Sequence, residues 1–301
     1  MMQTLTGIFP AMFTPMSAPD RFDEDGIRKL VSYLLDGGVQ GLFVLGSCGE
    51  FPVFSAEERA DIISIVRDAA GSATPILAGT SGVTTRQTIR HTSLAAERGA
   101  DVAVVLPPFY FGSSQAEIIA HFDAILNETE IPLLIYNNPF STQTKIEIGT
   151  LKSLSGHPQV VGIKDSTSDF AFHQDLLAAL WGTPTKVFQG DERLAAASFL
   201  AGCDGGTLGL ASLAPRVFVD IYEHAVQRDI EGAFAAQQTA NALLEIFEVR
   251  ENGGDGGFFA AAKAALQLLG VCADVLSRPF ARVTADELAR VESILKRHRL
   301  L

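Results

Sequence analysis

The chain has 301 residues, of which 47% are hydrophobic and 19% are charged, and its formal net charge is −12. This composition argues against long disordered segments, and the negative charge argues against nucleic acid or an anionic membrane as the partner. The length is that of two ordinary domains or of one large α/β barrel.

Eight short apolar runs rich in strand-forming residues recur along the chain. Several are almost continuously apolar, which is typical of parallel strands buried on both faces. The runs cover residues 8–16, 41–45, 75–78, 101–106, 132–136, 160–163, 186–188 and 206–210. Helical patterns lie between them, and three of these begin with a capping sequence, namely Ser55 with Glu58, Thr84 with Gln87 and Ser114 with Glu117.

The alternation of eight strands with helices at intervals of roughly 25–35 residues predicts an α/β fold, a (β/α)8 TIM barrel. A doubly wound sheet is the alternative, but no glycine fingerprint follows the first strand. We expect the barrel to occupy residues 1–230 and a C-terminal helical extension of the same domain to occupy residues 231–301. Helices are predicted over 230–250, 258–269 and 285–296, with a glycine-rich linker over 251–257.

Cysteine usage and terminal composition limit the location and the metal chemistry. The three cysteines, Cys48, Cys203 and Cys272, lie far apart, which favours a reducing compartment, so we expect a cytoplasmic protein. The sequence contains no CxxC or HxxxH spacing, so no metal site is predicted. The chain does not open on a basic segment and no apolar run reaches about 18 residues, so neither a signal peptide nor a membrane span is predicted.

Lys164 ends the sixth predicted strand, and in a barrel of parallel strands the functional residues lie at the C-terminal strand ends. Burial lowers the pKa of a lysine, and a neutral amine attacks carbonyl carbons to form a Schiff base. The alternative is a lysine that reaches solvent or pairs with Asp165. The residue type and its place therefore make Lys164 a candidate nucleophile.

Tyr136 ends the preceding strand. Adjacent strands lie about 4.8 Å apart, so Tyr136 and Lys164 face the same substrate atom if the strand ends are in register. A phenol beside a cationic iminium is a competent proton shuttle. The alternative is an ordinary tyrosine packed in the barrel.

The sequence GSCGE, residues 46–50, follows the second predicted strand. Successive backbone amides at Ser47 and Cys48 can form a nest for a carboxylate, and the Ser47 hydroxyl can link that end of the substrate to Tyr136. Two alternatives are a simple tight turn and a nucleophilic Cys48 thiol. The thiol would need a nearby histidine, and all six histidines fall in predicted helices or away from strand ends.

Six motifs in the same order resemble the dihydrodipicolinate synthase / N-acetylneuraminate lyase family over essentially the whole chain. They are GIFPAMFTP, GSCGE, PPFY, YNNP, GIKDS and AAKAALQLLG. The resemblance implies an imine between Lys164 and pyruvate or another 2-oxo acid, with protons relayed by Tyr136, Ser47 and Tyr110. Tyr110 is implied to reach the site of a neighbouring subunit. The family implies a homo-oligomer, expected to be a tetramer built as a dimer of dimers, and neither a metal nor an organic cofactor.

The resemblance also implies which residues hold the substrate. The carboxylate-binding amides match Ser47 and Cys48, and Gly190 matches the glycine whose backbone lines the imine pocket. Ser141 stands where dihydrodipicolinate synthases carry an arginine, and a serine cannot offer a bidentate cationic fork. In neuraminate lyases a polyol is held at positions that match Ser166, Glu192 and Arg193.

These residues together predict a Schiff-base-forming class I lyase. The expected reaction is that of a pyruvate-dependent aldolase, which cleaves a 2-oxo-3-deoxy (sugar) acid or forms it from pyruvate and an aldehyde. Three alternatives stay open: a 4-hydroxy-tetrahydrodipicolinate synthase, a 2-oxo-3-deoxy acid dehydratase, and a catalytically idle protein that binds a 2-oxo acid.

Overall fold

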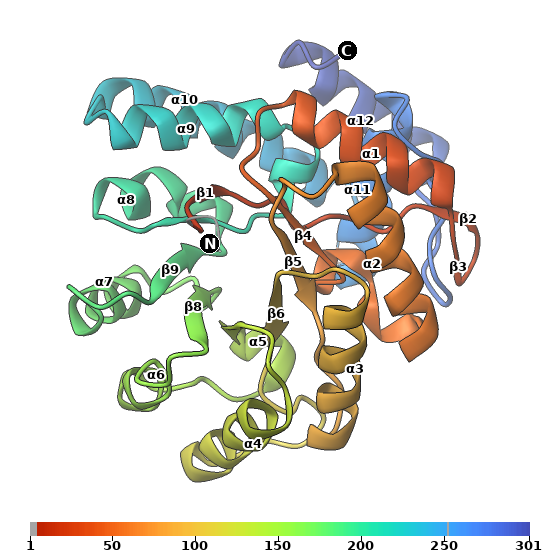
Figure 1. Cartoon of the computed structure of the whole chain (residues 1–301). Helices are drawn as coiled ribbons and strands as arrows, with labels where there is room; N and C mark the ends of the chain where they lie inside the picture. The colour runs from red at the N-terminus through yellow and green to blue at the C-terminus, as the bar shows by residue number, and fades with distance from the viewer. Residues whose placement is uncertain (1–4, 252) are drawn as a thin grey trace.

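The computed structural model describes residues 5–251 and 253–301, and its centre is a sheet of eight parallel strands (Figure 1). The sheet runs in the order β1-β10-β9-β8-β7-β6-β5-β4. Its strands are β1 (Gly7–Ile8), β4 (Leu42–Val44), β5 (Ile76–Gly79), β6 (Val102–Val105), β7 (Leu133–Asn137), β8 (Val160–Asp165), β9 (Lys186–Gln189) and β10 (Gly205–Gly206). A parallel bridge joins Ala11 to Phe43, and the Met12 amide donates to the Phe43 carbonyl at 2.8 Å. These contacts bring the segment after β1 beside β4 and close the predicted barrel.

Helices form a ring outside the strands, as Figure 1 shows. They are α1 (Glu24–Asp36), α2 (Ala56–Ala70), α3 (Thr85–Glu97), α4 (Gln115–Glu128), α6 (Ile148–Leu154), α7 (Phe170–Ala179), α8 (Ala195–Leu200) and α9 (Pro215–Val226), with the short α5 (Pro139–Thr142) after β7. The three predicted capping sequences are confirmed: Ser55, Thr84 and Ser114 each form a capping box. Each box satisfies amides at the helix start that have no partner within the helix.

Three helices follow the barrel, as the sequence predicts. They are α10 (Ile230–Leu243), α11 (Gly254–Leu268) and α12 (Ala285–Arg297). Helix α10 runs alongside α9, and α11 and α12 lie together on the side of α1 (Figure 1). Among the helices of the described ranges, none is long and apolar enough to cross a membrane.

The first and last predicted strands are much shorter than expected. The run 8–16 has regular strand geometry only at its start, because Pro10 has no amide hydrogen to donate, and its end belongs to the hairpin of β2 (Met16–Ala18) with β3 (Arg21–Phe22). The run 206–210 ends in the 3-10 turn η4 (Leu210–Ser212). The amides of Gly209 and Leu210 donate to the Glu192 side chain instead of a neighbouring strand.

The predicted linker over 251–257 is also wrong in part, because α11 already begins at Gly254. Helix-weakening glycines are tolerated in this first turn because Gly257 donates to the Gly253 carbonyl at 2.8 Å and packing holds the rest of the helix. The predicted helix 230–250 divides into α10 and the 3-10 turn η5 (Leu244–Glu248). Linker residue Asn252 and residues 1–4, where no signal peptide is expected, lie outside the described part of the chain.

The core fills the barrel and the layer between strands and helices. Residues of β4, β5, β6 and β7 are buried at every position, which explains their almost continuous apolar sequence. Phe9 and Phe188 meet edge to face across the barrel, with ring centroids 5.6 Å apart. Each fully buried aliphatic or aromatic side chain contributes about 1.5–3 kcal/mol, so this core holds the strand ends at fixed positions.

Candidate active site

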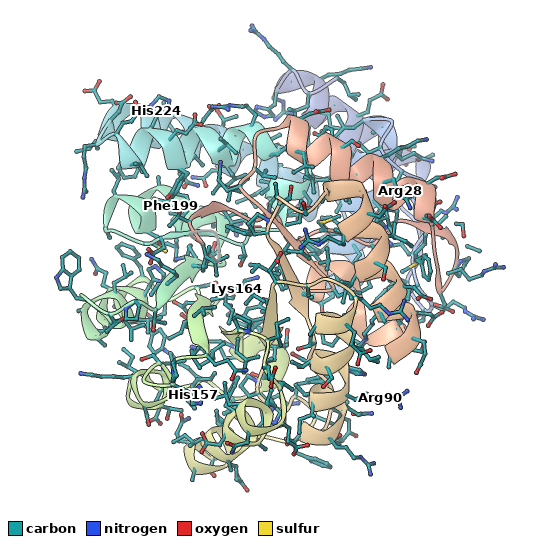
Figure 2. All side chains as sticks on the ribbon, viewed as in Figure 1. Arg28, Arg90, His157, Lys164, Phe199 and His224 are labelled. Atoms are coloured by element: carbon teal, nitrogen blue, oxygen red, sulfur yellow. The ribbon has the colours of Figure 1, made fainter. Side chains whose placement is uncertain are left out.

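Lys164 and Tyr136 lie side by side at the C-terminal ends of β8 and β7. They are register partners, which confirms the condition on which their joint action depends. The Lys164 side chain points into the middle of the barrel, where its Nζ lies 4.2 Å from the Tyr136 ring centroid and 5.0 Å from that of Phe43 (Figure 2). Lys164 is 4% exposed, so it does not reach solvent, and its ammonium faces two aromatic rings.

Asp165 does not pair with Lys164, which removes one of the alternative interpretations of the lysine. Successive side chains of a strand point to opposite faces, so Asp165 turns away from the barrel interior. Its Oδ2 lies 3.0 Å from Nδ1 of the buried His173 on α7, and its Oδ1 accepts from the Thr167 amide. The pair fixes the strand end from outside and leaves Lys164 without a carboxylate partner among the described residues.

The Tyr136 phenol belongs to a small polar network that the sequence did not predict. Asn138 Nδ2 donates to the phenol oxygen at 3.2 Å and to Ser141 Oγ at 3.0 Å. The hydroxyl of Ser166 also approaches the phenol oxygen, at 3.5 Å. Asn138 is buried, and its place two residues after Tyr136, on the same face of an extended chain, is the signal that points to it. The predicted relay from Ser47 to Tyr136 stays a prediction.

Gly190 follows β9 and borders Lys164. A Cβ atom at this position would lie 1.9 Å from Ser166 Oγ and 2.9 Å from Lys164 Cε, so any larger residue would displace the lysine. The Gly190 amide donates to the Asp165 carbonyl at 2.8 Å. The structure therefore brings Gly190, Ser166 and Lys164 together, while the roles that the resemblance assigns to Gly190 and Ser166 stay predictions.

The GSCGE segment forms a 3-10 turn, η1 (Ser47–Gly49), directly after β4. The Gly49 amide donates back to the Gly46 carbonyl at 3.0 Å. The first amides of a helical turn have no acceptor within the turn, so those of Ser47 and Cys48 are available to an anion. Burial raises the pKa of the Cys48 thiol to about 12, although Lys164 opposes this shift. A nucleophilic cysteine needs a thiolate, so the geometry favours the amide cradle over the thiol.

Glu50, the last residue of the segment, makes a buried ion pair that links two of the motifs. It has left-handed backbone geometry, with a φ of 51°, and its Oε1 lies 2.6 Å from Lys263 Nζ on α11. Its other oxygen accepts from the Ser277 amide at 3.2 Å and from the Ser277 hydroxyl at 2.5 Å. Burial lowers the pKa of the Lys263 ammonium, and Glu50 opposes this shift. The pair fastens the cradle to the C-terminal helices.

The resemblance assigns Glu192 and Arg193 to the binding of a polyol, but both side chains already have partners within the protein. Glu192 Oε1 accepts from the amides of Gly209 at 2.7 Å and Leu210 at 3.1 Å, and burial raises the pKa of its carboxyl. Arg193 is exposed and pairs with Glu248 on η5 at 3.2 Å. Binding of a substrate by Glu192 and Arg193 therefore stays a prediction, and their contacts within the protein do not support it.

Tyr110 lies on the surface, in the loop after β6. It is 69% exposed and packs edge to face on Phe111, which is 74% exposed, with ring centroids 4.9 Å apart. Two adjacent aromatic rings in solvent are unusual for an isolated subunit and are typical of a contact surface. Within this chain Tyr110 is not joined to the Tyr136 network by any hydrogen bond of the described residues.

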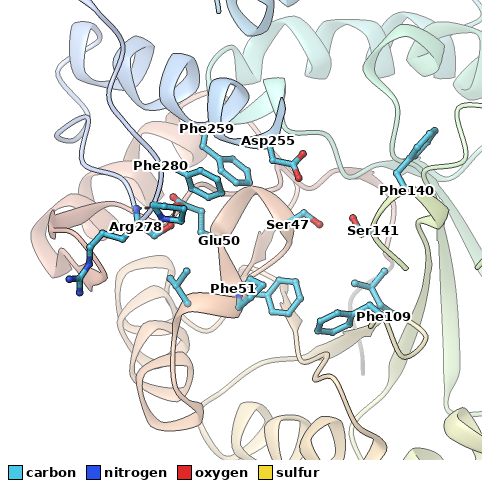
Figure 3. Close-up of a pocket in the computed structure, with 15 residues that line it drawn as sticks. Ser47, Glu50, Phe51, Phe109, Phe140, Ser141, Asp255, Phe259, Arg278 and Phe280 are labelled. Carbon is cyan, nitrogen blue, oxygen red and sulfur yellow. Dashed lines mark hydrogen bonds between the residues drawn. The ribbon is translucent and has the colours of Figure 1, made fainter. Parts of the chain in front are cut away.

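A cavity of about 510 Å³ opens beside the cradle (Figure 3). Ser47 and Ser141 line it from the barrel, while Asp255, Phe259 and residues 277–280 line it from the C-terminal part of the chain. Helix α11 and the segment that follows it therefore form a wall of the cavity. Throughout residues 5–251 and 253–301, no group of three or more His, Cys, Asp and Glu residues is arranged to hold a metal ion.

Known proteins are similar to this chain over nearly its whole length. Residues 4–298 match the model of the dihydrodipicolinate synthetase family. The N-acetylneuraminate lyase of Rhizobium meliloti is 30% identical over 285 residues, which cover 95% of this chain and 92% of the relative.

Two solved structures superpose closely on this one. The dihydrodipicolinate synthase of Bacteroides thetaiotaomicron has a TM-score of 0.93 at 31% identity, covering 99% of this chain and 100% of that one. A prophage protein of E. coli K12 from the dihydrodipicolinic acid synthase family, solved in complex with pyruvate, has a TM-score of 0.92 at 28% identity and covers 99% of both chains. With its family match over residues 4–298 and the Lys164–Tyr136 pair at the barrel mouth, the chain belongs to the dihydrodipicolinate synthetase family.

Proposed function

We propose that the protein is a pyruvate-dependent class I aldolase that cleaves or forms a 2-oxo-3-deoxy acid, a sugar acid by resemblance. The observation that carries this proposal is the buried Lys164, in register with Tyr136 and facing its ring at 4.2 Å. The relative solved with pyruvate supports a 2-oxo acid as the shared substrate. The partners of the reaction are pyruvate and an aldehyde.

In the cleavage direction the Lys164 amine attacks the 2-oxo carbon, and loss of water forms an iminium. Tyr136 takes the proton of the C4 hydroxyl, the C3–C4 bond breaks, and its electrons flow into the iminium to give an enamine. The aldehyde leaves, C3 is protonated, and water hydrolyses the imine to release pyruvate. The amides of Ser47 and Cys48 hold the carboxylate, and the absence of a side chain at Gly190 leaves room for the lysine.

A second candidate is 4-hydroxy-tetrahydrodipicolinate synthase, supported by the 31% identity to the Bacteroides enzyme. Ser141 argues against it. Its hydroxyl lines the cavity and accepts from Asn138, and it supplies no positive charge for a second carboxylate. A dehydratase that uses the same imine would share every contact of Lys164, and only product analysis separates it from an aldolase.

We propose that the active form is a homo-oligomer, a tetramer built as a dimer of dimers, in which Tyr110 completes the site of a neighbour. The exposed pair of Tyr110 and Phe111 supports this proposal. We place the end of the barrel near residue 230, where α10 begins, and the C-terminal extension in residues 231–301 of the same domain. The scattered cysteines support a cytoplasmic location.

Trapping of the imine tests the proposed chemistry. Incubation with pyruvate and borohydride is expected to add one reduced pyruvate per chain, and peptide mapping is expected to place it on Lys164. The matched control is Lys164→Ala, which removes the nucleophile at a strand end and should keep the fold. No adduct, or an adduct on another lysine, would contradict the mechanism. An adduct without turnover of any aldehyde would identify an idle binding protein.

A further inference from the structure

Aromatic side chains form two opposite walls of the cavity beside the cradle (Figure 3). Phe51 and Phe109 meet edge to face on one side, with ring centroids 6.0 Å apart. Phe259 and Phe280 meet on the other side, at 5.5 Å. All four rings line the cavity, so a molecule that fills it contacts mainly carbon.

Several polar side chains of the lining are already engaged within the protein. Glu50 is paired with Lys263 and accepts from Ser277. The guanidinium of Arg278 turns away from the cavity, as Figure 3 shows, and is held by Asp20 at 2.6 Å. These groups therefore offer little hydrogen bonding to a ligand.

The polar groups left to a ligand are few. They are the hydroxyls of Ser47 and Ser141 and the carboxylate of Asp255. A polyhydroxylated chain that enters such a cavity loses its hydrogen bonds to water, and several of its hydroxyls are left unpaired. An anionic chain meets the Asp255 carboxylate, while the cation of the described lining, Arg278, is already paired with Asp20.

The cavity begins where the predicted pyruvate site ends. Ser47 belongs both to the cradle and to the lining. Ser141, also in the lining, is joined through Asn138 to the Tyr136 phenol by contacts of 3.0 and 3.2 Å. The cavity therefore adjoins the Tyr136 phenol, which in the proposed reaction takes the proton of the C4 hydroxyl. The substituent of the aldehyde is bonded to C4, so it would enter this cavity.

We propose that the aldehyde partner carries an apolar substituent, aromatic or alkyl, in place of the polyhydroxylated chain of the sugar acid that the resemblance implies, and in place of an anionic chain. This inference rests on the proposed aldolase function and assigns its substrate class. In the condensation, the enamine carbon of pyruvate bonds to the aldehyde carbon, the carbonyl π electrons move to the aldehyde oxygen, and that oxygen takes a proton. Water then hydrolyses the iminium, which frees Lys164 and a 4-hydroxy-2-oxo acid with an apolar group at C4.

Three aldehydes test the substrate class at saturating pyruvate. Butanal and erythrose have the same carbon chain and differ by three hydroxyls, and benzaldehyde adds a flat ring. Concentrations are those of the free aldehyde, measured by NMR, because erythrose is mostly a cyclic hemiacetal in water. We expect kcat/KM for butanal and benzaldehyde to exceed that for erythrose by at least about tenfold, the scale on which pockets discriminate small apolar groups. Erythrose turnover equal to or faster than that of butanal would overturn the proposal. Imine trapping on the same preparation separates this result from a failure of the proposed function, in which no adduct forms.

The substitution Phe280→Ser makes one wall polar and serves as a second test. It is expected to lower the benzaldehyde-to-erythrose ratio of kcat/KM by about fivefold or more, because the ring loses an apolar contact. The ratio is measured on one preparation, so it does not depend on the folded fraction. The control is Trp181→Ser, which removes an 83% exposed aromatic side chain next to α7 and is expected to leave the ratio unchanged. An unchanged ratio in Phe280→Ser would contradict the proposal.

Discussion

Asn138 connects the cavity to the Tyr136 phenol through a single buried side chain. Its amide nitrogen donates to both Tyr136 and Ser141, so it fixes where the phenol oxygen stands. An amide does not relay protons readily, so we regard Asn138 as a positioning residue for Tyr136. Its burial at 8% exposure means that solvent cannot easily replace the donor that it provides.

The substitution Asn138→Leu keeps the side-chain size and removes the donor. We expect kcat to fall by about three- to tenfold, the effect of one hydrogen bond, while KM for pyruvate changes by less than about twofold. Steady-state kinetics measure kcat and the KM for pyruvate separately. Ser141→Ala is the control, because it removes the other partner of Asn138 and leaves the contact with Tyr136. A lower unfolding midpoint with unchanged kcat would mean that Asn138 only packs.

Residue type and strand position were enough to predict that Lys164 and Tyr136 stand side by side at the strand ends. Lys164 and Tyr136 end neighbouring apolar strands, and the regular spacing of parallel strands brings such ends together. The partners of Glu50 could not be predicted in this way. Ser277 lies 227 residues further along the chain, and only the complete fold decides which buried cation or hydroxyl meets the carboxylate. The hydrogen bonds that Glu192 accepts from the Gly209 and Leu210 amides could not be predicted either, because only the fold brings the start of η4 beside this side chain.

At the scale of elements, the Glu50–Lys263 pair joins the turn after β4 to α11. Both side chains are at most 1% exposed, so neither charge is solvated by water if its partner is removed. Lys263 Nζ also donates to the Val275 carbonyl at 2.9 Å, which ties the segment after α11 to the same point. The pair therefore positions both the cradle amides and the C-terminal wall of the cavity.

The substitution Lys263→Met is expected to lower the free energy of unfolding by about 3–5 kcal/mol, because it leaves Glu50 buried and unpaired. It should also raise KM for pyruvate, since the cradle loses its anchor. The double variant Glu50→Gln with Lys263→Met removes the unpaired charge and should recover part of the stability. Urea unfolding measures all three proteins, with Lys296→Ala, from an exposed pair, as the control. If the single and the double variant lose the same free energy of unfolding, the side chains of Glu50 and Lys263 are not coupled.

Helix α12 is attached to η5 and the following turn by the pair of Arg250 with Glu287. The hydrogen bond from Arg250 and the capping contacts of Thr284 lower the pKa of the Glu287 carboxyl from 4.5 to about 2. Because the folded-state pKa lies below the unfolded one, the pair stabilises the fold fully above pH 4.5. This stabilisation is lost as the pH falls from 4.5 towards 2.

The substitution Glu287→Gln should therefore lower the free energy of unfolding by about 1–3 kcal/mol at neutral pH, and by much less near pH 2. Denaturant unfolding across this pH range measures the difference from the native protein. The control Glu292→Gln removes a carboxylate of an exposed pair on the same helix and should have little effect at any pH. If the loss in free energy of unfolding caused by Glu287→Gln does not shrink as the pH falls, Glu287 acts by packing and not through its charge.

At the scale of the whole molecule, the site of one subunit lacks one predicted group. Lys164, Tyr136, Ser166 and Gly190 gather at the barrel mouth, while Tyr110 stands on the surface with its ring against Phe111. The sequence assigns Tyr110 by resemblance alone, and its role depends on a second copy of the chain. In a two-fold symmetric dimer the same surface serves both subunits, so each would give its tyrosine to the other.

A mixture of two inactive variants tests this exchange. Lys164→Ala has Tyr110 and no nucleophile, and Tyr110→Phe has the nucleophile and no hydroxyl to donate. In a mixed dimer the subunit that keeps Lys164 receives a normal Tyr110 from its partner, so one of the two sites is complete. Random exchange makes half of the dimers mixed, so about a quarter of the wild-type activity should return after the variants are unfolded and refolded together. Sedimentation at the assay concentration checks that both variants assemble. If the mixture stays inactive although mixed dimers form, Tyr110 does not act across the interface, and a fully active monomer would contradict the exchange in the same way.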